Sequence, residues 1–121
     1  MAADSPVKRR FSGAVAEWIS ARWLQMKGYR ILSRNYTVRG GELDIVAKKG
    51  DTLVFVEVKY RKNDRFGKAD EFVDKRKQKR LKLAALMYMA GNKVNPEKRN
   101  HRFDVIAIDR CRLRHIKNAF C

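Results

Sequence analysis

Charged side chains that could hold a cation or move a proton gather in one stretch of the sequence, GELDIVAKKGDTLVFVEVKY. It contains Glu42, Asp44, Glu57 and Lys59. Its two halves are rich in valine, isoleucine and leucine and flank Gly50-Asp51, a pattern that predicts a β-hairpin. A turn centred there places Asp44 opposite Glu57 and Glu42 opposite Lys59. Because side chains alternate along a strand, all four are expected on one face of the sheet.

Carboxylates held together repel each other and lose hydration, and a divalent cation offsets both costs. Mg²⁺ accepts one or two carboxylates and completes its shell with water and substrate phosphate. We therefore expect Asp44 and Glu57 to bind Mg²⁺, with Mn²⁺ as a substitute and the backbone carbonyl of Val58 as a third protein ligand. Lys59 would point at the same ion, where its ammonium group can position water and offset charge in the transition state.

The competing interpretation is that these groups form cross-strand ion pairs on a solvated face, each contributing at most about 1 kcal/mol. Val54, Val56 and Val58 predict one apolar face, whereas Phe55 indicates that the opposite face is covered as well. The pattern alone leaves a metal site and a set of structural ion pairs equally open.

The charge of the whole chain points to a polyanionic partner. Lys and Arg number 29 against 13 Asp and Glu, giving a formal charge of +16 on a chain that is still 45% hydrophobic. Such an excess suits nucleic acid, because Lys and Arg release its condensed counterions, but it does not separate an enzyme from a binding protein. No apolar run approaches the roughly 18 residues of a membrane span, and the two cysteines do not suggest a disulfide framework. We expect a cytoplasmic protein without a membrane partner.

The elements expected to position these residues form a single α/β domain over residues 1–121, with residues 1–10 as a flexible basic tail. Apolar side chains at Val15, Ile19, Trp23 and Met26 have the spacing of one face of a first helix, and Trp18 and Leu24 widen this stripe. The order is helix, three strands, helix, and one or two strands, building a mixed sheet flanked by helices. The expected bounds are Phe11–Lys27, Arg30–Val38, Glu42–Lys48, Leu53–Tyr60, Glu71–Ala90, Arg102–Asp109 and Arg112–Ile116.

The segment GELDIVAKKGDTLVFVEVKYR resembles the central motif of the PD-(D/E)XK nuclease superfamily, and AEWISARWLQMKGYRILSRNY, VDKRKQKRL and RFDVIAI add supporting matches. The chain is most similar to the YraN-like family of small bacterial proteins, predicted endonucleases similar to archaeal Holliday junction resolvases. The resemblance implies a restriction-endonuclease-like fold and Mg²⁺-dependent hydrolysis of DNA, at branched or junction structures. This sequence differs from the family pattern at two positions. It has Leu43 where the superfamily motif has proline, and Ala16 where relatives have glycine.

Position by position, the resemblance makes Asp44 the motif aspartate, Glu57 and Lys59 the E-x-K pair, and Glu17 the acid of the first helix. From its sequence context alone, Glu17 would be a solvated glutamate. Glu42 would support the metal ligands without replacing them.

The same resemblance implies that Lys77 of the second helix binds phosphate. From the sequence alone, Lys77 is one of a run of solvated basic residues. Arg61, in a charged loop, would grip the nucleic-acid strand, although a plain basic loop explains it equally. Symmetric cutting of a junction would need two sites and hence a homodimer. The alternatives are a non-catalytic nucleic-acid-binding protein with a relict site and, on charge alone, an RNA-associated ribosomal-type factor.

Overall fold

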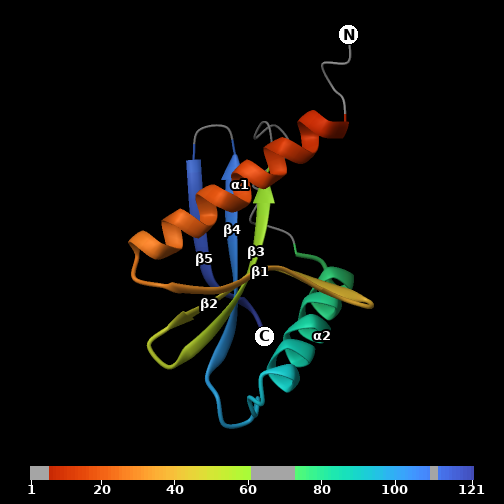
Figure 1. Cartoon of the computed structure of the whole chain (residues 1–121), viewed down its shortest axis with the longest axis vertical. Helices are drawn as coiled ribbons and strands as arrows, with labels where there is room; N and C mark the ends of the chain where they lie inside the picture. Colours follow the sequence, from red (N-terminus) through yellow and green to blue (C-terminus); the bar gives the residue numbers. More distant parts are fainter. Residues whose placement is uncertain (1–5, 61–72, 110–111) are drawn as a thin grey trace.

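The computed structural model describes residues 6–60, 73–109 and 112–121 of the chain, so Arg61 lies outside the described residues. Within these ranges two helices and five strands follow one another in the expected order (Figure 1). Their bounds are α1 Pro6–Met26, β1 Arg30–Val38, β2 Gly41–Lys49, β3 Thr52–Tyr60, α2 Lys75–Gly91, β4 His101–Asp109 and β5 Arg112–Phe120.

The strands form one mixed sheet in the order β1-β2-β3-β4-β5. Neighbouring strands are antiparallel except β3 and β4, which are parallel and are separated in the chain by α2. The β2–β3 pairs include Ile45 with Val56 and Val46 with Phe55, so the register expected from the Gly50-Asp51 turn is confirmed. The sheet and its two helices confirm the predicted α/β class and are consistent with a restriction-endonuclease-like fold.

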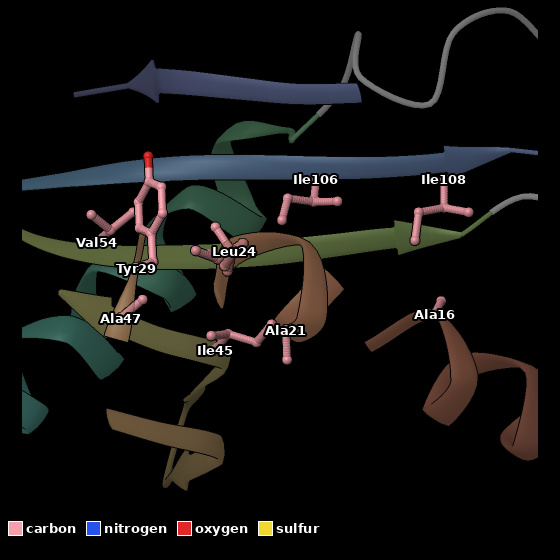
Figure 2. Close-up of a cluster of buried hydrophobic side chains, with 10 residues drawn as sticks. Ala16, Ala21, Leu24, Tyr29, Ile45, Ala47, Val54, Ile106 and Ile108 are labelled. Atoms are coloured by element: carbon pink, nitrogen blue, oxygen red, sulfur yellow. The ribbon is translucent and has the colours of Figure 1, made fainter. Parts of the chain in front are cut away.

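Both faces of the sheet are covered, as the strand pattern predicted. On one face α1 packs against the even-numbered valines of β3, and Figure 2 shows this cluster with side chains from α1, β2, β3 and β4. Its buried members are Ala16, Ala21, Leu24, Tyr29, Ile45, Ala47, Val54, Val56, Ile106 and Ile108. On the other face α2 covers Phe55, in a cluster of Leu43, Val46, Leu53, Phe55, Leu81, Ala84, Ala85, Met89 and Phe103. Glu57 of β3 is therefore buried in a sheet that is covered on both faces.

The predicted apolar stripe of α1 coincides only in part with the buried face. Leu24 is buried and Trp23 packs against the core, but Trp18 and Met26 are 56% and 78% exposed, and Val15 and Ile19 are also exposed. The rest of the buried face consists of the small residues Ala16, Ser20 and Ala21. Small side chains on the buried face allow a helix to approach a sheet closely, and hydrophobic periodicity does not register that preference.

Several element ends also differ from the prediction. Helix α1 begins at Pro6, before the expected start at Phe11; proline suits a first helical position because its φ is already helical. Helix α2 begins at Lys75 because the Asp74 side chain accepts a hydrogen bond from the Lys77 amide and caps the helix. Strand β5 continues past Ile116 to Phe120.

The tip of the β1–β2 hairpin is pressed against α2. Gly40 turns the chain with a φ of +88°, in the left-handed region that favours glycine. A Cβ at Gly41 would overlap the carbonyl oxygen of Arg80, so only glycine permits this approach. The contact brings Glu42, the next residue, within reach of the basic first half of α2.

Candidate active site

The pairing of β2 with β3 ends at Ile45 and Val56. The next residues beyond this last pair are Asp44 on β2 and Glu57 on β3. There Asp44 Oδ2 accepts a hydrogen bond of 2.8 Å from the backbone N–H of Val58. The side chain of Asp44 is thereby anchored to the backbone of β3 beside Glu57. The structure brings together the two carboxylates that the hairpin register predicted.

Glu57 has the least usual environment of the site residues. It is only 7% exposed, and its Oε1 atom is buried without a hydrogen-bond partner among the described residues. Its Oε2 atom lies 3.5 Å from the Lys77 ammonium nitrogen. Burial, and secondly the negative charge of Asp44, raise the pKa of Glu57 to about 8, although Lys77 opposes the shift. Near neutral pH this carboxyl group therefore carries a proton unless a cation takes the proton's place.

Helix α1 contributes Glu17, as the resemblance implied. Glu17 Oε1 accepts hydrogen bonds from Asn35 Nδ2 at 3.0 Å and from Arg34 Nε at 3.3 Å. Burial, then the nearby charge of Asp44, raise its pKa, with Arg34 and Asn35 opposing. Asn35 has a φ of +54°, a left-handed conformation that asparagine tolerates. Sequence analysis missed Arg34 and Asn35 as the residues that hold Glu17, and an asparagine inside a strand was the available signal.

Helix α2 contributes Lys77, which lies at the carboxylates and not on a separate surface. Its ammonium nitrogen is also 3.8 Å from Glu42 Oε1. The same Glu42 oxygen lies 3.3 Å from Arg80 NH2, so Glu42 forms its ion pairs with α2. The expected Glu42–Lys59 pair is not part of the β2–β3 ladder, because the ladder stops at Ile45. Sequence analysis did not anticipate either contact between α2 and the acidic residues.

Lys59 lies two residues beyond Glu57 on β3, half-buried and paired with Ala107 of β4. Strand alternation gives it the same face as Glu57. The side chain of Val58 packs toward the α1 cluster, and its backbone N–H reaches Asp44. A ligand role for its carbonyl oxygen stays a prediction, as does the strand-gripping role of Arg61.

The donor set fits a hard divalent cation held by few protein groups. Within the described ranges no cluster of three or more His, Cys, Asp or Glu is arranged to enclose a metal. Asp44 and Glu57 nevertheless place two carboxylates together, and the unpartnered Glu57 Oε1 is a buried acceptor with nothing to accept from. Mg²⁺ requires no more than one or two carboxylates when water and phosphate complete its shell.

The family model described as "Uncharacterised protein family UPF0102" matches residues 16–108 of the chain. The chain belongs to family UPF0102. The matched region runs from α1 to β4 and includes Glu17, Asp44, Glu57, Lys59 and Lys77. The candidate site thus lies wholly inside the part of the chain that defines the family.

Similar UPF0102 proteins come from several bacteria. The protein from Pelotomaculum thermopropionicum is 45% identical over 118 residues, covering 93% of this chain and 97% of the relative. The one from Alkaliphilus oremlandii is 40% identical over 112 residues, covering 89% and 96%. The one from Serratia proteamaculans is 41% identical over 114 residues, covering 94% and 97%. These relatives share nearly the whole length of the chain. No helix within the described part of this UPF0102 chain is long and apolar enough to cross a membrane.

Proposed function

We propose that this UPF0102 protein is a Mg²⁺-dependent endonuclease that hydrolyses phosphodiester bonds in DNA, with branched or junction DNA as its substrate. One observation carries the proposal: two carboxylates meet at the end of a hairpin ladder, one of them buried with an unpartnered oxygen and a pKa raised to about 8. Burying a carboxyl group beside a second carboxylate costs free energy. A ligand that binds the charged form of Glu57 explains why the protein has this arrangement. The formal charge of +16 supports a polyanionic substrate.

In this proposal Asp44, Glu57 and the carbonyl oxygen of Val58 hold the metal, with Mn²⁺ as a substitute for Mg²⁺. The bound ion supplies Lewis-acid activation of water and neutralises charge on the phosphate. Lys59 positions the attacking water and stabilises the charge that grows on the phosphate oxygens. Hydrolysis adds this water across one P–O bond, leaving a phosphate monoester on one product and a hydroxyl group on the other.

The remaining residues act around that centre. Glu17, held by Arg34 and Asn35, completes the acidic side of the site. Glu42 supports it by holding the Lys77 ammonium group near the Glu57 carboxylate. Lys77 then binds a phosphate oxygen of the substrate, together with Arg61. A substrate of this kind places the protein in the cytoplasm, and symmetric cutting of a junction requires a homodimer.

The deciding experiment incubates the parent protein with labelled four-way junctions, flaps, nicked and intact duplexes, and single strands. Each DNA is assayed with Mg²⁺, Mn²⁺ or EDTA, beside Lys59→Ala and Asp44→Asn. We expect cleavage by the parent that needs the metal and is lost in both variants. Cleavage that survives in both variants would come from a contaminating nuclease and would remove the support for the site.

A second candidate is a DNA-binding protein whose nuclease site is a relict. The contact of 3.5 Å between Lys77 Nζ and Glu57 Oε2 favours it, because a lysine lies beside the buried carboxyl group without any metal. This candidate shares the expected affinity for DNA but predicts no metal-dependent cleavage by the parent on any DNA of the panel. A parent protein that binds DNA and cuts none of it would replace the nuclease proposal with this one.

A further inference from the structure

A second basic site lies at the C-terminal end of α1, on the face of the sheet that α1 covers. A pocket of about 370 Å³ opens there between the helix end, the start of β1, the end of β2 and the middle of β5. Its lining consists of three aromatic or imidazole rings and three lysines, namely Trp23, Lys27, Tyr29, Lys49, His115 and Lys117. The lining contains no acidic residue.

The rings of the pocket are fixed by a buried polar network. Trp23 Nε1 donates to His115 Nδ1 at 3.4 Å, and His115 Nε2 lies 2.8 Å from Asp104 Oδ2. Arg102 binds both oxygens of the fully buried Asp104 and donates to the Tyr29 hydroxyl at 2.6 Å. The Arg102 and Asp104 charges cancel, so the network positions the pocket walls without neutralising the lysines.

The ammonium groups are themselves held in place. Lys27 Nζ lies 4.6 Å from the centre of the Trp23 ring, and Lys49 Nζ lies 4.8 Å from that of Tyr29. Lys49 also donates to the carbonyl oxygen of Lys27. Gly28 makes this possible, because it has a φ of +91° and a Cβ there would lie 3.3 Å from Lys49 Nζ.

The positive charge in the pocket is uncompensated. Among the residues that the structure describes, no ion pair involves Lys27, Lys49 or Lys117. The faces of the Trp23 and Tyr29 rings already carry ammonium groups, so the pocket offers N–H donors and not an open ring for a stacked base. Convergent ammonium donors of this kind suit the oxygens of a phosphate group.

We propose that this pocket binds a phosphate of the DNA strand, as an anchor remote from the carboxylates. The inference rests on the proposed function in taking DNA as the ligand. The pocket is separate from the carboxylate site, because its lining includes neither Asp44 nor Glu57 nor Lys77.

The binding test uses the full chain and nuclear magnetic resonance. A thymidine dinucleotide, with or without a 5′-phosphate, is titrated while the indole N–H signals of Trp23 and Trp18 are followed. Trp18 is the internal control, since it is exposed on α1 and outside the pocket lining. We expect the Trp23 signal to shift and the Trp18 signal to stay. A shift with both dinucleotides assigns an internal phosphodiester, and a shift only with the phosphorylated one assigns a strand end; either supports the pocket.

A matched pair of double variants separates the pocket from general charge. Lys27→Ala with Lys117→Ala should weaken the dinucleotide affinity about tenfold, because two of the three ammonium donors are lost. Lys82→Ala with Lys98→Ala removes the same charge from outside the pocket and the carboxylate site, and should change the affinity less than about twofold. Circular dichroism confirms that both variants remain folded. Equal losses of dinucleotide affinity in the two double variants would overturn the proposal that the pocket binds phosphate. A Trp23 signal that does not move would overturn it as well.

The two proposals fail separately. Metal-dependent cleavage by a parent protein whose Trp23 signal ignores the dinucleotides would leave the nuclease and remove the anchor. A responsive pocket in a parent that cuts no DNA would leave the anchor and remove the nuclease. On a DNA that is cut, a single neutral methylphosphonate is moved along the strand away from the cleaved bond. At one position it should weaken binding of the parent but not of Lys27→Ala with Lys117→Ala, and the absence of any such position would refute the anchor.

Discussion

Replacing Glu57 by glutamine tests whether the buried carboxyl group is held in a state that only a cation relieves. Glutamine keeps the shape of the side chain and removes its ionisation. In the parent protein the pKa of Glu57 is raised from its ordinary 4.5 to about 8, so between these values the folded state binds more protons than the unfolded state. The parent should therefore lose stability, relative to Glu57→Gln, as the pH rises from 4.5 to 8.

The size of this effect follows from the width of the pH window. Each pKa unit corresponds to about 1.4 kcal/mol of free energy. The contribution of Glu57 is fully present below pH 4.5, and at pH 7 up to about 3 kcal/mol of it has been lost relative to the glutamine variant. A mismatch in the packing of glutamine would add a constant at every pH, so the difference in slope isolates the ionisation.

Urea unfolding followed by tryptophan fluorescence measures the free energy of unfolding at several values between pH 4.5 and pH 8.5. Glu97→Gln is the matched control, because Glu97 is exposed and distant in sequence from the hairpin. At pH 8, Mg²⁺ should stabilise the parent and leave Glu57→Gln unchanged, since the ion binds only the charged carboxylate. Parallel stability profiles for the parent and Glu57→Gln would refute the reasoning about the buried pair.

Four further outcomes can be checked directly. Lys59→Ala should reduce the cleavage rate by about 100-fold or more, as loss of one preorganised electrostatic group commonly does, while gel-shift affinity changes little because one of 29 basic residues is lost. Asp44→Asn should abolish cleavage and greatly weaken Mn²⁺ binding in calorimetry, yet bind DNA without metal at least as tightly, since a carboxylate that repels phosphate is neutralised. DNA affinity of the parent should fall roughly 10³-fold between about 50 and about 200 mM salt if about six phosphates are contacted, and a flat profile would contradict the charge argument. Asp104→Ala should lower the free energy of unfolding by about 3 kcal/mol in urea titrations, because Arg102 and His115 lose their shared partner; an unchanged stability would show that the network is dispensable.

The strands and the meeting of Asp44 with Glu57 could be read from the sequence because their causes are local. A glycine-containing turn sets the register of a hairpin, and alternation then assigns every side chain on it to a face. The Gly50-Asp51 turn therefore predicted the observed pairing of Ile45 with Val56. The first helix shows the limit of such reasoning. Trp18 and Met26 of this helix face outward, while alanine and serine occupy much of the buried face and allow a closer approach to the sheet.

The sequence by itself determined the α/β class, the order of the elements and the register of the hairpin next to its turn, since each depends on neighbours close in the chain. Only the tertiary structure decided that Lys77 contacts Glu57, that Arg34 and Asn35 hold Glu17, and that three separated lysines share one pocket. These contacts join residues on elements far apart in the chain. They depend on how the two helices seat on the sheet, which is set by the shapes of buried side chains such as Ala16 and by the hairpin tip at Gly41, and no local pattern encodes that fit.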